Sequence, residues 1–577
     1  MTRLYNEPSA FADEMIEGFV AANTRYVRAV PGGVARSTVS PAGQVALVIG
    51  GGSGHYPAFG GLVGQGLAHG AAMGNLFASP ATSQVESVAR AAENGGGVLL
   101  SYGNYAGDVL NFDAAEARLR AAGIPTETVT VTDDISSASI EEKHKRRGIA
   151  GDLTVFKAAA AAAEAGYELA EVARVARLAN ERTRSFGVAF SGCTLPGAAE
   201  PLFTVPEGRM AVGMGIHGEP GIRETDVPTA DELAELLVAR LLEDLPEGVE
   251  TPAGARVVPI LNGLGSVKYE ELFVVYRRIA GLLGEAGLEL VDPHVGEFCT
   301  SFDMAGTSLT LFWLDDELER LWDAPADTPA YRKGSVVAAD RRTAVAAAAV
   351  EVEELPEATD ESRLAAGAVL AAVQTIADTI DAHVDELGRM DAIAGDGDHG
   401  IGMQRGAVAA RAAAISAEEA GAGAGTVLIR AGDAWAARAG GTSGALWGLA
   451  LRTIGERLGD SVRPSAVGVA DAVSGAQRGI QEYGKAEVGD KTLVDALVPF
   501  AETLTRQVAG GSSLAESWRI AAREASTAAA ATSDLLPRMG RARPHAEKSL
   551  GTPDPGAHSL ALIVTAIGAV LADRAGA

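Results

Sequence analysis

Residues Gln44–Gly52 read QVALVIGGG and decide the fold class of the first half of the chain. The apolar run has the length and composition of a strand that is buried on both faces, and the three glycines allow a tight turn after it. The same order of a short β-branched run, a glycine turn and a helical stretch recurs at Gly96–Asn104, Thr126–Asp134 and Ala255–Gly265. This alternation predicts an α/β fold for residues 1–333.

Residues 361–577 carry a different pattern. Apolar residues recur at spacings of three and four along Ala-, Leu- and Val-rich stretches, such as RLAAGAVLAAVQTIADTIDAHVDELG at Arg363–Gly388. This periodicity predicts helices, and we expect an all-α helical bundle with glycine-rich loops between its helices. Residues 334–360 are Ala-rich and then acidic, with a proline and no compact apolar face, which is typical of an interdomain linker.

The composition narrows the function classes. The 577 residues include 48 Lys and Arg against 75 Asp and Glu, a formal charge of −27. So acidic a chain repels phosphate backbones and anionic lipids, which disfavours nucleic-acid and membrane-surface roles. The two cysteines are too few for a disulfide framework or a cysteine metal site. The N-terminus has no apolar signal region, and the apolar stretch Leu560–Ala572 is shorter than the roughly 20 residues that span a bilayer, so we expect a cytoplasmic protein.

The sharpest motif of the second half is MDAIAGDGDHGIGM at Met390–Met403. It places Asp391, Asp396 and Asp398 within eight residues, and the intervening glycines allow the three carboxylates to converge. Convergent carboxylates repel each other unless a hard cation lies among them, which favours Mg²⁺ with phosphate. An acidic turn that caps helices is the alternative, whereas a calcium EF-hand is disfavoured because the downstream Glu is absent.

Three further glycine-containing segments open or join helices in this half: Ala437–Gly448, Val488–Leu497 and Gly540–Gly556. The first offers hydroxyl groups at a helix N-terminus, a position that suits an anion, although close packing explains such a loop equally well. Neither half contains a GxxxxGK[ST] phosphate loop, so a nucleotide would have to be held in another way.

The first half carries three candidate positions. His55 follows the triple glycine in GGGSGHYP, Asp108 follows a predicted strand in SYGNYAGD, and His217 stands between glycines in GIHGEPG. Sites in α/β folds gather at the ends of strands. A lone histidine is more often a structural hydrogen-bonding residue than a catalytic one, so the roles stay open on spacing alone. The glycine turn does not match GxGxxG, which makes a dinucleotide fold a weak interpretation.

Taken in order, these motifs resemble the dihydroxyacetone kinase family. GGGSGH, NYAGD, GIHGEPG and SGCTLPG are similar to its substrate-binding K-type domain, and GDGDHG, GGTSG, GDKTLVDAL and GRA…DPG to its nucleotide-binding L-type domain. The resemblance covers nearly the whole chain in the fused, ATP-dependent order. It implies two α/β subdomains in residues 1–333, ATP as phosphoryl donor, and a homodimer.

The resemblance also implies roles for individual residues. His217 would bind the substrate ketone as a covalent hemiaminal, Asp108 would accept the proton of the attacking hydroxyl, and His55 would assist orientation or proton transfer. The implied substrate-binding set is Gly52, Ser53, Gly54, His55, Gly103, Asp108 and His217. Asp391, Asp396 and Asp398 would hold two Mg²⁺ ions. The implied nucleotide-binding set is His399, Gly400, Ile401, Gly402, Thr442, Ser443, Gly484, Leu493, Arg541, Asp554, Pro555 and Gly556.

Two departures from the family pattern lie in the sugar site. Tyr56 replaces the acidic residue of GGGSGHEP, and Gly103 replaces a lysine before NY(T/A)GD. Loss of the long cationic side chain should open space for a longer ketose, so we expect a tetrulose kinase acting on erythrulose, with dihydroxyacetone as the alternative. An FAD-AMP lyase that cyclises its product and a non-enzymatic regulator are more remote alternatives.

Overall fold

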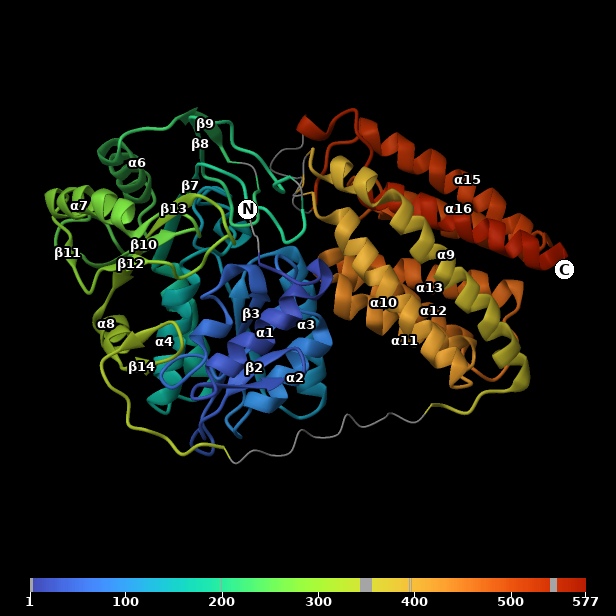
Figure 1. Cartoon of the computed structure of the whole chain (residues 1–577), viewed down its shortest axis with the longest axis horizontal. Helices are drawn as coiled ribbons and strands as arrows, with labels where there is room; N and C mark the ends of the chain where they lie inside the picture. The colour runs from blue at the N-terminus through green and yellow to red at the C-terminus, as the bar shows by residue number, and fades with distance from the viewer. Residues whose placement is uncertain are drawn as a thin grey trace. The chain divides into compact units, whose positions relative to one another are not determined.

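The computed structural model describes residues 4–198, 200–219, 221–342, 355–393, 395, 397–539 and 547–576. It divides into two compact units, residues 1–346 and 347–577, with the boundary inside the predicted linker (Figure 1). The first unit contains the strands and the second is helical. The predicted fold class, α/β followed by all-α, is therefore confirmed.

The first unit contains a six-stranded mixed sheet in the order β1-β2-β4-β3-β5-β6, with β4, β3, β5 and β6 parallel. Its strands are β1 (Val27–Val30), β2 (Gly33–Arg36), β3 (Ala46–Gly52), β4 (Gly70–Gly74), β5 (Val98–Gly103) and β6 (Thr126–Val131). Leu47 and Ile49 of β3 pack on one face, and Ala46 and Val48 on the other. The predicted apolar strand is thus buried on both faces.

A second sheet of seven strands follows in the order β11-β10-β13-β7-β8-β9, with β12 beside β10. Its strands are β7 (Thr183–Ala189), β8 (Arg209–Val212), β9 (Arg223–Asp226), β10 (Arg256–Gly263), β11 (Glu289–Leu290), β12 (His294–Gly296) and β13 (Gly306–Leu314). A short hairpin of β14 (Ala326–Asp327) and β15 (Arg332–Lys333) ends the unit. Two sheets agree with the expectation of two α/β subdomains.

Helices cover both sheets. They are α1 (Phe11–Ala22), α2 (Thr82–Ala92), α3 (Ala106–Ala121), α4 (Asp152–Glu164), α5 (Leu169–Glu181), α6 (Ala230–Leu242), α7 (Tyr269–Glu285) and α8 (Asp316–Asp323). Helix α4 belongs to a core that includes residues of both sheets, and all of it except Glu164 is buried. Its run of alanines, Ala158–Ala163, explains how a helix fits there, because small side chains permit close approach on every side.

Lys157 is the exception in this alanine-rich helix. Its side chain is fully buried, and its Nζ donates to the carbonyl oxygen of Leu321 at 3.0 Å. Burial, with a smaller contribution from the charge of Lys333, lowers the pKa of Lys157 to about 7. The unfolded chain keeps this amine protonated up to a pH of roughly 10.4. The unfolded state therefore binds more protons between these values, and folded stability should rise with pH across that window.

We expect Lys157→Met, which keeps the length of the side chain, to remove this dependence. Between pH 7 and 10, the free energy of unfolding of the wild type should rise relative to that of the variant by up to about 1.4 kcal/mol per pH unit. Urea unfolding at several pH values measures the difference. Lys145→Met, at an exposed position, is the matched control. A gap between wild type and Lys157→Met that stays constant across this range would contradict the expectation.

The second unit is a ring of helices in which each helix packs on the next and the last returns to the first. They are α9 (Asp360–Asp391), α10 (His399–Glu419), α11 (Ala424–Ala439), α12 (Gly441–Leu458), α13 (Ala466–Gly484), α14 (Val494–Ala509), α15 (Leu514–Ala531) and α16 (Pro555–Gly576). Helices α9 and α16 are long and apolar enough to cross a membrane by length and composition, a test that core helices of a bundle also pass. Both pack their apolar residues into the common core of this unit.

Candidate active site

His55 and His217 meet directly, although 162 residues separate them in the sequence. The Nε2 atoms of the two rings lie 2.9 Å apart, and both side chains are buried. His55 lies in the short 3₁₀ turn that follows β3, and His217 lies in the loop after β8. Phe77 packs against both rings, with ring centroids 5.2 Å from His55 and 5.7 Å from His217. The two predicted histidines thus belong to one site with an aromatic wall.

The partners of the outer nitrogens fix how the two rings carry their protons. The Nδ1 of His55 lies 2.8 Å from the carbonyl oxygen of Thr300, and the Nδ1 of His217 lies 3.1 Å from Oε1 of Glu219. A carbonyl and a carboxylate are acceptors, so each Nδ1 carries a hydrogen. The hydrogen bond between the two Nε2 atoms then requires one further proton, which the two rings share. We infer that the pair carries one positive charge, balanced by Glu219.

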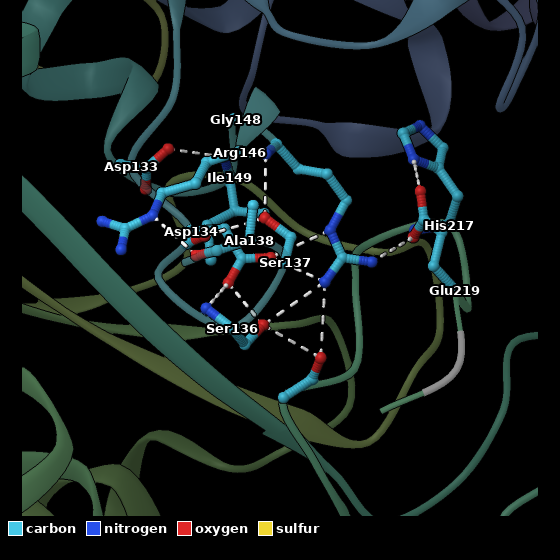
Figure 2. A network of polar contacts seen from close by, with 12 residues as sticks. Asp133, Asp134, Ser136, Ser137, Ala138, Arg146, Gly148, Ile149, His217 and Glu219 are labelled. Atoms are coloured by element: carbon cyan, nitrogen blue, oxygen red, sulfur yellow. Dashed lines mark hydrogen bonds and ion pairs between the residues drawn. The ribbon is translucent and has the colours of Figure 1, made fainter. Parts of the chain in front are cut away.

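Glu219 belongs to a larger polar network that the sequence analysis did not identify (Figure 2). Its Oε2 accepts from the backbone N–H of His217 at 3.0 Å and lies 3.8 Å from the guanidinium of Arg147, which forms a 2.7 Å ion pair with Asp134. Burial lowers the pKa of Arg147, but the two carboxylates outweigh burial and keep it above its usual value. Arg147 therefore keeps its positive charge beside Glu219, which contacts His217.

Gly218 allows this arrangement. It has a φ of +84°, and a Cβ atom there would lie 1.9 Å from the ring of Phe203. Any other residue would be strained and would clash, so glycine lets the chain fold Glu219 back beneath His217. The GIHGEPG spacing was the available signal for Glu219, because a carboxylate two residues from a histidine can orient its ring.

Asp108 lies in the first turn of α3, directly after the end of β5, and is 9% exposed. Tyr105, the N-cap residue of this helix, packs its ring edge-on against His217 with a centroid distance of 4.5 Å. The hydroxyl of Tyr105 donates to the carbonyl oxygen of Gly148 at 3.0 Å. The start of helix α3, which carries Asp108, is therefore anchored at His217.

The glycine turn after β3 packs closely against a neighbouring loop. The backbone N–H groups of Ser53 and Gly54, two residues of the implied substrate-binding set, donate to the carbonyl oxygens of Asn75 and Leu76. A Cβ on Gly52 would lie 2.5 Å from the oxygen of Leu76, so glycine permits this close approach. The Ser53 hydroxyl is buried and has no hydrogen-bond partner, which leaves it free for a ligand.

The surroundings of Gly103 bear on the expectation of open space there. A Cβ atom on Gly103 would lie 3.2 Å from the carbonyl oxygen of Gly148 and 3.3 Å from the ring of Tyr105. The space that a lysine would enter is thus partly occupied by a backbone segment 45 positions further along the chain. Gly103 does not leave an open void beside it, and the tetrulose hypothesis needs other support.

In the second unit, residues of α9, α12 and α16 meet at His399, the first residue of α10. Its Nε2 lies 3.0 Å from Oγ of Ser559, and its Nδ1 lies 3.4 Å from Oγ of Ser443. Its backbone N–H donates to Oδ2 of Asp391 at 3.4 Å. Burial lowers the pKa of His399 and outweighs the opposite effect of Asp391, which favours a neutral ring.

Carboxylates gather around this histidine. Asp554 accepts from the backbone N–H of Ala557 at 2.7 Å, and burial together with the charges of Asp391 and Asp495 raises its pKa to about 7. Asp495, which the sequence analysis did not single out, closes the loop before α14 by accepting from the N–H groups of Gly489 and Thr492. Such an excess of negative charge fits a bound cation.

The predicted metal ligands are only partly described. Asp391 ends α9 and Asp398 directly precedes α10, whereas Asp396 lies outside the described residues. Among the residues that the structure does describe, no group of three His, Cys, Asp or Glu side chains is close enough to form a complete metal site. Carboxylates are the ligands that Mg²⁺ prefers, so the donor types present fit that ion.

The other predicted nucleotide-binding residues are spread over several elements. Gly400, Ile401 and Gly402 form the first turn of α10, and Thr442 is exposed at the start of α12. Gly556 and Leu493 are neighbours, since a Cβ on Gly556 would lie 3.4 Å from that of Leu493. Pro555 begins α16, Gly484 ends α13, and Arg541 lies outside the described residues.

Comparisons with known proteins cover both units. Residues 17–330 match the Dak1 domain and residues 393–569 match the DAK2 domain. An L-erythrulose kinase of Pectobacterium atrosepticum is 64% identical over 99% of this chain and 97% of its own. A D-erythrulose kinase and an L-erythrulose 1-kinase of Mycolicibacterium smegmatis are 55% and 53% identical, over 97% and 98% of this chain and 97% and 99% of their own.

A solved structure matches the chain from end to end. It is the dihydroxyacetone kinase of C. freundii in complex with AMP-PNP and Mg²⁺, which is 29% identical, covers 98% of this chain and 99% of its own, and has a TM-score of 0.52. Its ligands are a nucleotide and the metal expected from the aspartate motif. With both domains matched on one polypeptide, the chain belongs to the dihydroxyacetone kinase family in its fused Dak1–DAK2 form.

Proposed function

We propose that this chain transfers the γ-phosphoryl group of ATP to a terminal hydroxyl of erythrulose, which it holds through a covalent bond to His217. The chain is an ATP-dependent sugar kinase of its family. Erythrulose is supported by three relatives named as erythrulose kinases, each more than half identical over nearly the whole chain. Their names include both enantiomers, so the proposal leaves the choice between D- and L-erythrulose to experiment.

The observation that carries the covalent step is the fixed orientation of the His217 ring. Glu219 holds its Nδ1–H, so the lone pair of Nε2 faces His55. In the proposed step, Nε2 adds to the ketone carbon, and the carbonyl oxygen takes the proton that the two histidines share. A carbon–nitrogen bond and an O–H bond form, while the carbonyl π bond and the N–H bond of the shared proton break. The positive charge moves to the His217 ring, where Glu219 stabilises it.

Once the sugar is fixed, its terminal hydroxyl can attack the phosphoryl group. Asp108 accepts the proton of this hydroxyl as the new bond forms, because a carboxylate is a suitable general base at this position. Fixing the sugar lowers the entropic barrier of the transfer. Two Mg²⁺ ions at Asp391, Asp396 and Asp398 would neutralise charge on the transferred phosphoryl group. His399 and Ser443 would lie beside the phosphates.

The sugar and ATP sites lie in different units, so transfer requires that they approach each other. We propose that the enzyme acts as a cytoplasmic homodimer. This assembly accounts for the division of the chemistry between two separately folded units. Size-exclusion chromatography with light scattering measures the mass of the assembly, and a monomer at working concentration would contradict it.

Steady-state kinetics test the proposed substrate. We expect kcat/KM for one erythrulose enantiomer to exceed that for dihydroxyacetone by at least about tenfold, a difference that one additional hydrogen-bonded hydroxyl can supply. ADP release with D-erythrulose, L-erythrulose and dihydroxyacetone gives the three values. If dihydroxyacetone were the best substrate by tenfold, the chain would be a dihydroxyacetone kinase and the proposed substrate would be wrong.

A further inference from the structure

Asp152 is a buried carboxyl group that has no role in the proposed chemistry described above. It is the first residue of α4, is 2% exposed, and its Oδ1 has no hydrogen-bond partner. An aspartate in the first turn of a helix gains from the helix dipole, but that gain needs no burial. Burying a carboxyl oxygen without a partner costs free energy, so such an atom in a folded protein calls for an explanation.

The carboxyl of Asp152 faces the end of β5, where residues of the sugar site begin. A Cβ atom on Gly148 would lie 2.4 Å from Cα of Gly103 and 3.0 Å from Oδ1 of Asp152. A single methyl group on Gly148 would thus fill the space between Cα of Gly103 and Oδ1 of Asp152. Gly103 precedes Asn104 and Tyr105, and Tyr105 packs on His217. Asp152 therefore lies behind the segment Gly103–Tyr105, which packs on the proposed covalent residue.

The electrostatic surroundings place Asp152 near two further residues of this region. Burial raises the pKa of Asp152 well above its usual value, and the charges of Asp133 and Asp108 raise it further. Asp133 has partners of its own, since its two oxygens accept from the N–H groups of Ile149 at 2.8 Å and Gly151 at 2.9 Å. No backbone N–H donates to Oδ1 of Asp152, and in its protonated form this carboxyl offers one O–H donor and one acceptor oxygen.

A third segment, which contains Cys299, also lies near Asp152. Burial, followed by the charges of Asp152 and Asp133, raises the pKa of the Cys299 thiol. Cys299 is adjacent to Thr300, whose carbonyl oxygen holds His55. Asp152 thus lies near Asp108 and near two segments that contact His55 and His217. A group with one donor and one acceptor at that position is suited to a sugar hydroxyl, which also donates and accepts.

We propose that Asp152 is a specificity-determining residue of the sugar site, where its carboxyl binds a hydroxyl that a tetrulose has and dihydroxyacetone lacks. The inference rests on the proposed function. Dihydroxyacetone has two hydroxyls, one of which is the phosphoryl acceptor at Asp108. A tetrulose has one more hydroxyl. Recognition of that hydroxyl requires a polar group of the protein that dihydroxyacetone does not contact.

Two variants and two deoxy sugars test this role. Asp152→Ala should lower kcat/KM for the preferred erythrulose by about 100-fold and for dihydroxyacetone by less than about threefold, because only the tetrulose loses a buried hydrogen bond. Asp152→Asn, which keeps a donor and an acceptor, should restore most of the loss. Of 3-deoxy and 4-deoxy tetrulose, wild type should discriminate against an analogue that keeps the phosphoryl-acceptor hydroxyl, and Asp152→Ala should treat that analogue and erythrulose alike. Asp113→Ala, at an exposed position on α3, should leave every ratio unchanged.

The outcomes separate this inference from the proposed function. If wild type prefers a tetrulose but Asp152→Ala lowers kcat/KM equally for all ketoses, Asp152 supports the reaction or the fold, and its role in specificity is wrong. If wild type uses both deoxy tetruloses as well as erythrulose, no additional hydroxyl is recognised and the inference fails even without a folded variant. A wild type that prefers dihydroxyacetone would overturn the proposed substrate and this inference together.

Discussion

A His217→Ala variant should form no covalent adduct with erythrulose and should lose roughly 10³-fold or more in kcat/KM. Alanine removes the nucleophilic Nε2, so the sugar can bind only through hydrogen bonds and loses its fixed orientation. Native mass spectrometry of the protein incubated with erythrulose measures the adduct, and coupled ADP release measures turnover. The adduct and most of the rate should disappear together, because in our proposal one bond supports both.

The control for this variant is His144→Ala, which removes an exposed histidine from the same unit. It should retain both the adduct and the rate. Thermal unfolding of His217→Ala separates a local loss from a misfolded protein, since the histidine pair lies within the core region. A His217→Ala enzyme that still carries the mass of one sugar, or that turns over at nearly the wild-type rate, would refute the covalent role.

An Asp108→Asn variant should keep the adduct and lose about 10²- to 10⁴-fold in kcat, the usual contribution of a general base. Asparagine has the shape of aspartate but cannot accept the proton of the attacking hydroxyl. Binding of the ketone at His217 does not require that proton transfer, so the mass adduct should remain. Single-turnover kinetics with ATP in excess measure the transfer step directly.

Asp113→Asn provides the matched control, because Asp113 lies one and a half turns further along α3 at an exposed position. It should leave kcat and the adduct unchanged. Near-normal turnover by Asp108→Asn would exclude Asp108 as the base. Loss of the adduct in that variant would instead assign Asp108 to sugar binding, contrary to the proposed division of roles.

The fold could be predicted well because its signals are local. The run that forms β3 has apolar residues on both faces of the sheet, and both faces are buried. The helical periodicity after Asp360 continues through α16. The α/β character of the first half and the all-α character of the second follow from these patterns alone. Residues 343–354 of the predicted linker lie outside the described residues, although the units divide within it.

Site residues could be predicted only where they belong to a short sequence motif. His55 and His217 were identified singly, but their 2.9 Å contact depends on packing between β3 and the loop after β8. The close packing at Gly103 could not be foreseen, because Gly148, which contacts it, is distant in sequence. Asp152 reads as an ordinary helix start, and only its burial distinguishes it. Contacts of this kind come from tertiary packing, which no local pattern encodes.

The most direct test of the central claim is a crystal structure of the wild-type enzyme with erythrulose bound. We expect continuous density from Nε2 of His217 to a tetrahedral second carbon of a four-carbon sugar, with His55 beside the oxygen of that carbon. A planar ketone at non-bonded distance from His217, with full occupancy, would contradict the account.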